Sequence, residues 1–371
     1  MMRIGIALSG GGIRALVFHL GILARLAAEN RLEEIRFIST VSGGSLCAAL
    51  VFSATNYQWP SSAGFRDEVV PYLRDLLTTE DLQRQLLWKI LLSPRYLFRG
   101  RANALSELLE RTWKIEGRLP DLPDQPRWII NATCHETGKR WRFEKKRMGD
   151  YAFGQVEYPD IAISQAVAAS SAVPFAIGPL TLDTRPYKWC RYGNNQTLEA
   201  SKPPEKRIHL WDGALYDNLG VEALVKMGEQ YRNDEVDFLV VSDASPSLVS
   251  QSYWPWQRRV RRLYDITSNQ VQAIRTREVM NRLKRRDPPG GYFKIGRSAK
   301  YIFEQCGREE EIAQVKSSML SDAEIIWARD MGLSLRKLSM SEFDCLFKHG
   351  FEVANFTLFA YNSHEFSLLS S

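Results

Sequence analysis

The sequence has few cysteines and no long apolar segment. Its five cysteines form no C-x-x-C pair and no metal-ligand spacing, so we expect neither a disulfide framework nor a metal site. The apolar run near the start is too short for the core of a secretory signal and leads into a glycine cluster, which indicates a first strand in a cytoplasmic protein. No window of about 18 apolar residues occurs, so any membrane contact should be peripheral.

The composition is that of an ordinary packed protein with a basic surface. Its 371 residues suffice for one large domain or two smaller ones, and 44% hydrophobic with 25% charged residues excludes extensive disorder. The net charge of +6 and the pI near 9.0 are compatible with an anionic partner. A phospholipid surface is one such partner. Nucleic acid is not expected, because the basic residues are not interleaved with aromatic side chains for base stacking.

Two strand–turn–helix units in the first fifty residues predict the fold class. Residues 3–8 form an apolar strand that ends in a glycine turn, and residues 15–28 have helical apolar spacing. Residues 36–41 and 46–52 repeat this unit around a second turn. The repetition favours an α/β fold with a mostly parallel central sheet flanked by helices.

The rest of the chain is predicted to complete this core and to add helices. Residues 65–118 have the spacing of a helical insertion. Further strands are expected at residues 128–133, 139–143 and 207–211, with a helix at 161–170 and an apolar strand at 236–242 as the last central one. We therefore divide the chain into an α/β core, residues 1–250, and a mostly helical C-terminal part, residues 251–371, that packs on the core.

Ser42 is the first candidate catalytic residue. It follows a predicted strand and precedes a helix in Thr40-Val41-Ser42-Gly43-Gly44, which is the G-x-S-x-G pattern with threonine in place of its first glycine. A sharp turn of this kind exposes a serine hydroxyl above a sheet and next to a helix N-terminus, as a nucleophile requires. The alternative is a serine that only caps an ordinary helix.

The glycine cluster at residues 10–12 is the second candidate feature. Gly10, Gly11 and Gly12 can present several backbone N–H groups to an anion, so we interpret them, with Gly43 and the nearby Arg14, as an oxyanion or substrate site. We expect Arg14 to anchor the loop by salt bridging. A phosphate loop and a purely structural tight turn are the competing interpretations.

Asp212 is the candidate general base, and it opens Asp212-Gly213-Ala214 at the end of a predicted strand. A carboxylate is a poor base in water, but burial beside a serine raises its pKa usefully. An Asp-Gly turn without catalytic function is the alternative. Among the five histidines only His209, three residues before Asp212, is placed to act in a triad instead.

Taken together, these motifs resemble those of the patatin-like phospholipase family. The resemblance rests on the Gly10-Gly11-Gly12-Ile13-Arg14 loop, on Ser42, and on Asp212-Gly213-Ala214 followed by Asp217-Asn218. It implies a Ser42–Asp212 dyad without a catalytic histidine, and a glycine loop that supplies oxyanion donors. Thr40, where the family usually has glycine, puts the detailed geometry of the turn in question.

The sequence therefore predicts a lipid acyl hydrolase of the phospholipase A type that acts on phospholipid or other acyl esters without a cofactor. A His209-dependent esterase or thioesterase and a weakly catalytic lipid-binding regulatory module remain as alternatives. Residues 88–98 and the arginine-rich residues 258–286 are candidates for contact with a membrane surface. Their other interpretation is a core helix with a solvated basic face. The sequence assigns no oligomeric state.

Overall fold

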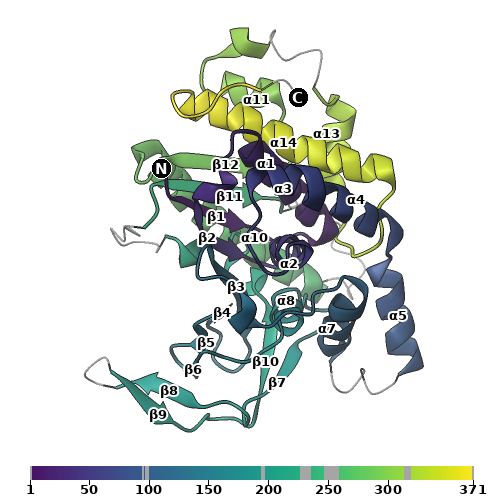
Figure 1. The fold of residues 1–371 in the computed structure, drawn as a ribbon, viewed down its shortest axis with the longest axis vertical. Coiled ribbons are helices and arrows are strands. Elements are labelled where there is room, and N and C mark those ends of the chain that lie inside the picture. The colour runs from purple at the N-terminus through teal and green to yellow at the C-terminus, as the bar shows by residue number, and fades with distance from the viewer. Residues whose placement is uncertain are drawn as a thin grey trace.

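The computed structural model describes residues 2–93, 96, 100–193, 197–225, 235–245, 259–312 and 319–369. Twelve strands form one sheet, with most of them in the order β12-β11-β1-β2-β3-β4-β5-β6-β8-β9, and helices cover it (Figure 1). The pairs β12–β11, β11–β1, β1–β2 and β2–β3 are parallel. The predicted α/β fold with helices around a parallel centre is confirmed.

Both predicted strand–turn–helix units are present at the centre of the sheet. β1 (Ile4–Leu8) leads into α1 (Gly12–Ala28), and β2 (Ile35–Thr40) leads into α2 (Gly43–Ala54). Because β1 and β2 are parallel, their carboxyl ends meet at one edge of the sheet. The glycine loop after β1 and the Ser42 turn after β2 are therefore neighbours.

The length of β3 (Arg127–Cys134) determines what else reaches this edge. Its first half pairs with β2, from Phe37↔Arg127 to Thr40↔Ile130, and its last residues pair with the antiparallel β10 (Arg207–Asp212). β10 thus occupies the space that opens where β2 ends. Its last residue, Asp212, pairs with Ala132 and so lies beside the Ser42 turn.

The remaining strands are mostly antiparallel and extend the sheet away from the centre. The prediction that residues 139–143 form a strand agrees with β4 (Arg140–Glu144). The others are β5 (Arg147–Asp150), β6 (Gly154–Glu157), β7 (Leu180–Asp183), β8 (Trp189–Tyr192) and β9 (Leu198–Ser201). β7 pairs with β10, and β8 and β9 form a hairpin at the far end of the sheet (Figure 1).

The prediction that residues 236–242 form the last central strand agrees with the structure, but the chain adds one further strand, at the edge of the sheet, that was not predicted. β11 (Phe238–Asp243) is followed by β12 (Gly290–Lys294), which pairs with it in parallel from Leu239↔Gly290 to Asp243↔Lys294. The sequence did not predict β12 because the strand begins with two glycines, which are unusual inside strands. A Cβ at Gly290 would lie 2.0 Å from Leu239 O, so glycine is what the close backbone contact requires.

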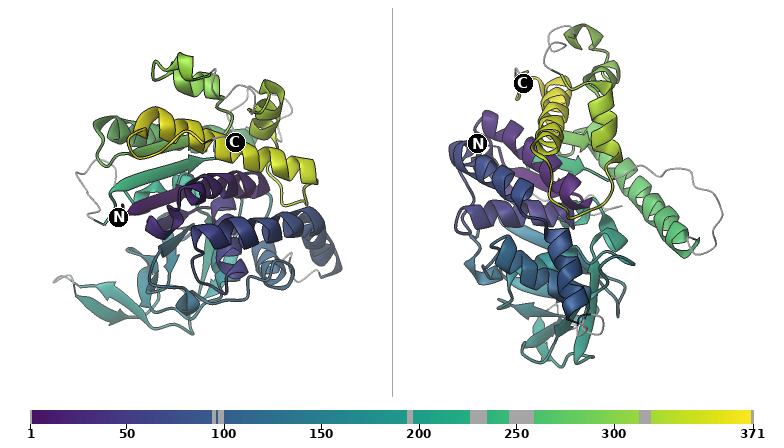
Figure 2. Two further views of the ribbon diagram at one scale, coloured as in Figure 1. Left: turned by 45° about the horizontal axis from the view of Figure 1, so that its top comes forward. Right: turned by 90° about the vertical axis from the view of Figure 1, so that its right-hand side faces the viewer.

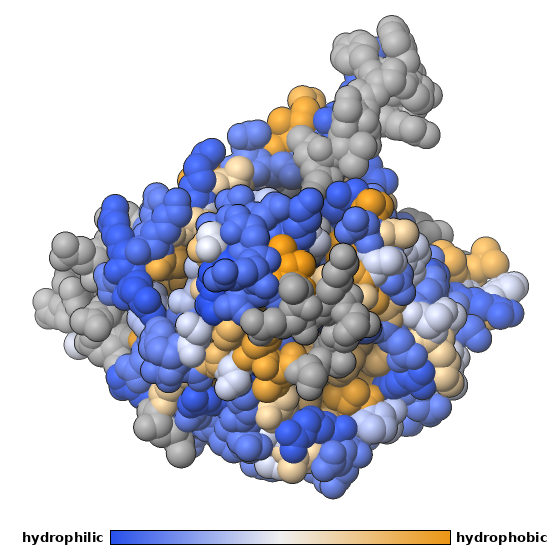
Figure 3. All heavy atoms as spheres, turned by 90° about the horizontal axis from the view of Figure 1, so that it is seen from above, coloured by the Kyte–Doolittle hydropathy of each residue, from blue (hydrophilic) through white to orange (hydrophobic). Residues whose placement is uncertain are grey.

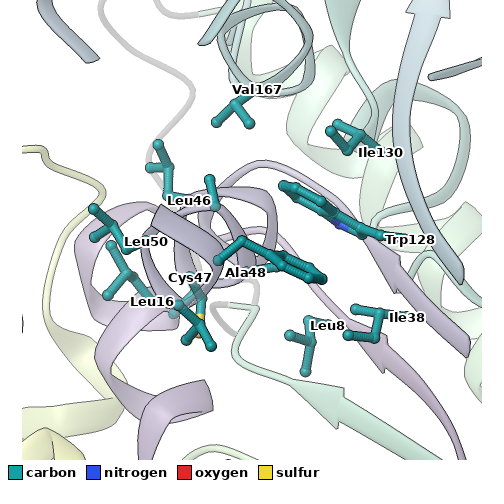
Figure 4. Close-up of a cluster of buried hydrophobic side chains, with 14 of the residues drawn as sticks. Leu8, Leu16, Ile38, Leu46, Cys47, Ala48, Leu50, Trp128, Ile130 and Val167 are labelled. Carbon is teal, nitrogen blue, oxygen red and sulfur yellow. The ribbon is translucent and has the colours of Figure 1, made fainter. Parts of the chain in front are cut away.

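The two faces of the central sheet bury different side chains, as strand alternation requires. Ile4, Ile6 and Leu8 of β1 point to the core beneath α1 and α2, whereas Ala7 points to the other face with Val241. Figure 4 shows the first core, with Leu8, Ile38 and Trp128 on one side of α2 and Leu46 and Leu50 on the other. Burial on both faces explains why these strands are continuously apolar.

Within its described residues, the predicted helical segment at residues 65–118 contains a π-helical turn, Phe65–Val69, and three α-helices: α4 (Val70–Thr79), α5 (Leu82–Leu92) and α7 (Arg101–Thr112). α8 (Ile163–Ser170) follows β6, close to the range predicted for it. None of the helices described is long and apolar enough to cross a bilayer.

The C-terminal part contains α10 (Arg259–Arg285), α11 (Ala299–Glu304), α13 (Asp322–Asp330) and α14 (Met340–Asn362). α14 packs along α1, and the closest approach is at two glycines. A Cβ at Gly350 would lie 2.0 Å from Phe18 O, and one at Gly21 would lie 2.0 Å from Phe347 O. The start of α10 instead extends beyond the body of the protein (Figure 2, right).

Several apolar side chains are exposed in the two candidate segments for membrane contact, residues 258–286, which contain α10, and residues 88–98. Val260, Leu263, Ile266 and Ile274 are exposed, whereas the buried positions of this helix are Arg275, Val279 and Arg282. On α5, Leu87, Trp88, Leu91 and Leu92 are exposed as well. Pro94, Arg95, Leu97, Phe98 and Arg258, which belong to the same predictions, lie outside the described residues.

Candidate active site

Ser42 occupies a strained turn between β2 and α2. Its φ of 49° and ψ of −115° lie in a region that residues with a side chain rarely adopt. The backbone N–H of Ser42 donates to Ser170 Oγ at 2.9 Å, and its side chain is buried at the start of α2. This is the conformation expected of a nucleophilic serine in a sharp turn between a strand and a helix.

Thr40, the departure from the family pattern, supports this turn from below. Its hydroxyl accepts hydrogen bonds from Ser45 Oγ at 2.9 Å and from Trp128 Nε1 at 2.9 Å. Ser45 Oγ also lies 2.8 Å from Ser170 Oγ, which itself holds the N–H of Ser42. The threonine therefore adds a buried polar network beneath the nucleophile turn instead of disrupting it.

The glycine loop presents free backbone donors beside Ser42. Gly11 and Gly12 have φ values of 148° and 63°, which favour glycine, and a Cβ at Gly43 would lie 2.4 Å from Gly12 O. Gly10 N donates to Asn218 O at 3.2 Å, so this donor is already used. Within the described residues, the N–H groups of Gly11, Gly12 and Gly43 donate no hydrogen bond.

Asp212 is buried, with 2% of its surface exposed, and interacts with Ser42. Its Oδ1 accepts a hydrogen bond from Ala214 N at 2.8 Å. Burial raises the pKa of Asp212 from 3.8 to about 7, although hydrogen bonds from Ala214 and from the Ser42 hydroxyl favour the ionised form. The carboxyl group therefore changes its protonation state near neutral pH.

Arg14 does not anchor the loop by a salt bridge, contrary to the prediction. Its guanidinium donates to three backbone carbonyls, those of Arg329 at 2.8 Å, Met331 at 2.7 Å and Ala244 at 2.7 Å. Ile13 N donates to Ser334 O at 3.0 Å in the same region. Arg14 thus holds the end of α13 and the residues after it against the glycine loop. Burial lowers the pKa of Arg14 to about 10.

Ser42 and Asp212 face a cavity of about 660 Å³, called here the Ser42 cavity. Gly10, Gly11 and Arg14 line it as well. Its other walls come from the chain after α8 and from the C-terminal part: Val173, Pro174, Phe175, Arg261, Tyr264, Asp265, Asp330, Met331, Gly332 and Leu333. The volume lies in the range of small-molecule sites, and the walls contain both apolar and charged side chains, which suits an amphiphilic substrate.

Comparison with known proteins gives the family. The patatin-like phospholipase profile matches residues 6–225, which is more than half of the chain. The chain belongs to the patatin-like phospholipase family. This match includes the glycine loop, Ser42 and Asp212 but ends before α10. A search of the curated proteins found no match.

Solved structures agree with this patatin-like fold. Human GIVD cytosolic phospholipase A2 is 13% identical, with a TM-score of 0.52, and the match covers 98% of this chain and 62% of that one. The same human protein in complex with methyl gamma-linolenyl fluorophosphonate inhibitor and terbium chloride gives 15% identity, a TM-score of 0.52, and coverage of 98% and 59%. The patatin-like chain thus spans about three fifths of these relatives, and at this identity the likeness concerns the fold.

The histidines of this patatin-like protein lie away from the Ser42 cavity. His209 pairs with Glu136, with Nδ1 2.8 Å from Oε1, and its side chain is 42% exposed. Because it is three residues from Asp212 in β10, it points to the other face of the sheet. His19 is buried under the glycine loop, with Nε2 2.9 Å from Ser9 O, and burial lowers its pKa to about 4.

Several residues of the site have no function that the sequence alone indicates. Ser170 lies in a segment that resembles the family, but nothing in the sequence shows that its hydroxyl holds Ser42. Tyr264, Met331 and Leu333 lie outside the family match, and no local pattern places them beside Ser42. Among the described residues, no group of three or more histidine, cysteine or acidic side chains could hold a metal ion.

Proposed function

We propose that this protein is a lipid acyl hydrolase of the phospholipase A type, with Ser42 as nucleophile and Asp212 as general base. The observation that carries the proposal is that Ser42 and Asp212 line one cavity, where burial raises the pKa of the Asp212 carboxyl group to about 7. A base with a pKa near the working pH combines a large ionised fraction with sufficient basicity. Family membership supports the same assignment.

The reaction follows from the positions of these groups. Ionised Asp212 takes the proton of Ser42 as its Oγ attacks the acyl carbonyl carbon, and the N–H groups of Gly11, Gly12 and Gly43 stabilise the resulting oxyanion. Asp212 then gives this proton to the departing alcohol. The acyl group remains bound to Ser42 as an ester. Water, deprotonated by Asp212, releases the fatty acid and restores Ser42. Each oxyanion donor contributes about 3 kcal/mol to transition-state stabilisation.

The site favours this mechanism over the histidine-dependent alternative. His209 contacts Glu136 and is absent from the walls of the Ser42 cavity. A dyad reaction should therefore persist in His209→Gln, whereas a triad reaction should be lost.

The decisive test is Ser42→Ala. We expect it to abolish fatty-acid release from phosphatidylcholine, measured by mass spectrometry on purified protein, and to abolish labelling by a fluorophosphonate probe. His209→Gln is the matched control and should retain both signals. Undiminished hydrolysis by Ser42→Ala would refute the proposal, and so would labelling of wild-type protein at another serine.

We further propose that the mouth of the Ser42 cavity contacts the lipid surface. Phe175 and Leu333 line the cavity and are 58% and 53% exposed, and Leu263 is 65% exposed beside Tyr264. The ring of Tyr264 contacts that of Phe175, with centroids 6.1 Å apart. Exposed apolar side chains around a substrate entrance are suited to insertion at a membrane interface. The face seen in Figure 3 is instead mostly hydrophilic, with separate apolar patches.

Flotation with vesicles of phosphatidylcholine and phosphatidylglycerol tests this contact. We expect Val260→Ser/Leu263→Ser to reduce the bound fraction about tenfold, because each apolar side chain contributes about 1–2 kcal/mol when inserted. Ile274→Ser, at an exposed position farther along α10, is the control and should bind normally. Equal binding of the double variant and wild type would exclude this entrance as the contact. If only Leu91→Ser/Leu92→Ser reduces vesicle binding, the membrane contact lies on α5.

A further inference from the structure

A second cavity lies at the other end of the parallel strands. It has a volume of about 680 Å³ and is lined by Arg36 and Phe37 at the start of β2, by Arg127 at the start of β3, and by the β4–β5 hairpin. Ser42 comes six positions after Arg36, so at about 3.3 Å per residue the two cavities are roughly 20 Å apart. We call this second cavity the basic cavity.

Cations outnumber carboxylates in its walls. The lining includes six cationic side chains, Arg3, Arg36, Arg127, Lys145, Lys146 and Arg147, and four carboxylates, Asp124, Glu144, Glu157 and Glu235. Of the carboxylates, Asp124, Glu157 and Glu235 are exposed to solvent and only Glu144 is buried; Arg3 is paired with Asp237, outside this lining. Around the β4–β5 hairpin, the lining therefore has more cationic side chains than carboxylates.

The two carboxylates of this part are shared among five cations. Glu144 is buried and lies 2.6 Å from Arg127 Nη2, 2.8 Å from Arg147 Nε and 3.7 Å from Arg142 Nε. Asp124 Oδ1 lies 3.5 Å from Lys145 Nζ and 3.8 Å from Lys146 Nζ. The pKa of Arg142 is lowered to about 10, first by burial and then by the positive charge of Arg147. Burial is the larger cause of this lowering, and the neighbouring positive charge adds to it.

The arginines of the basic cavity also retain hydrogen-bond donors. Arg147 uses Nε for Glu144, and Arg127 uses Nε and Nη2. Within the described residues, both terminal nitrogens of Arg147 and Nη1 of Arg127 donate no hydrogen bond. The planar arginine fork matches the oxygens of a phosphate, and neighbouring lysines add point charges.

We propose that the basic cavity binds a soluble phosphate-bearing anion of small-molecule size. Its volume lies in the usual range for such ligands. A soluble ligand is favoured over a lipid head group because the exposed apolar residues Phe175 and Leu333 surround the Ser42 cavity at the opposite end of the strands. A bilayer held there does not reach the basic cavity. The site is thus separate from the substrate site and lies largely on the β2–β5 part of the sheet.

Calorimetric titration with inorganic pyrophosphate tests the proposal. We expect wild type to bind it and Lys146→Gln/Arg147→Gln to bind about tenfold or more weakly, because two charge-assisted contacts are lost. Arg261→Gln, which removes a cation from the Ser42 cavity, is the matched control and should bind as wild type does. In both folded variants Glu144 keeps Arg127 as a partner.

Two measurements make the outcome independent of variant folding and of hydrolysis. Pyrophosphate should raise the unfolding midpoint of wild type, since a ligand that binds only the folded state stabilises it. Binding should persist in Ser42→Ala. The proposal is overturned if wild type neither binds pyrophosphate nor is stabilised by it, or if Arg261→Gln weakens binding as much as the double variant. It is also overturned if Lys146→Gln/Arg147→Gln leaves pyrophosphate binding unchanged and reduces only flotation with phosphatidylcholine–phosphatidic acid vesicles.

Discussion

At the scale of single residues, the site depends on the surroundings of two side chains. Ser42 is held in a strained conformation by the turn and by Ser170, whose hydroxyl oxygen accepts the backbone N–H of Ser42. Asp212 has the pKa of a useful base only because it is buried. Neither property belongs to the amino acid itself, since Ser-Gly-Gly and Asp-Gly also occur in ordinary caps and turns.

Asp212→Asn should remove activity and raise stability above neutral pH. The folded-state pKa, about 7, exceeds the ordinary value of 3.8, so the folded protein holds this proton more tightly. Stability from this group is therefore greatest near pH 4 and falls as pH rises through about 7, whereas kcat/KM rises over the same range. The asparagine variant should gain on the order of 2–4 kcal/mol above pH 7 and nothing near pH 4.

Urea unfolding across this pH range measures the effect. Asp183→Asn is the opposite control, because Arg185 lowers the pKa of the exposed Asp183 to about 2 and its loss should bring no gain at high pH. A stability difference between wild type and Asp212→Asn that stays constant with pH would show that burial of the charge is not the cause.

At the scale of elements, the site is assembled by unequal strand lengths and by helix anchoring. β3 extends beyond β2, so β10 can bring Asp212 to the Ser42 turn. α10 carries Tyr264 to the cavity and is anchored by Arg275, which lies 2.8 Å from Glu222 Oε2 and 3.5 Å from Asp217 Oδ1. The buried face of α10 is thus built around arginines, with Arg275 and Arg282 buried beside Val279.

Arg275→Met should lower the free energy of unfolding by about 3 kcal/mol, because it leaves Asp217 buried beside a side chain that cannot neutralise it. It should also reduce hydrolysis, since the α10 wall of the Ser42 cavity loses this anchor. Adding Asp217→Asn should restore part of the stability. Chemical unfolding of the single and double variants tests this coupling, and additive losses would contradict it.

At the scale of the whole molecule, the C-terminal part is continuous with the core. β12 adds a strand to the central sheet, and α14 lies along α1, whose N-terminus is the glycine loop (Figure 1). The boundary that we placed at residue 250 therefore coincides with a change of sequence character, and the sheet itself continues beyond it. Packing of α14 should consequently affect the entire fold.

Gly350→Ala is expected to destabilise the whole protein by about 2 kcal/mol, because its Cβ would lie 2.0 Å from Phe18 O and must push α14 from α1. Gly332→Ala, where a Cβ meets nothing within 4 Å, is the control and should unfold at the wild-type midpoint. Thermal unfolding should show a single lowered transition for Gly350→Ala. A separate early transition would instead mean that α14 unfolds independently.

The sequence by itself determined the local units of this protein. Glycine and serine turns between apolar strands and helices depend on neighbouring residues only, so the α/β class and the candidates Ser42 and Asp212 were predictable. Tertiary structure decided what lies together: Asp212 reaches Ser42 across 170 positions, Arg14 binds carbonyls of a distant segment, and the basic cavity collects charges from separate strands. Long-range pairing and burial set these contacts and pKa values, and neither is encoded within a short stretch of chain.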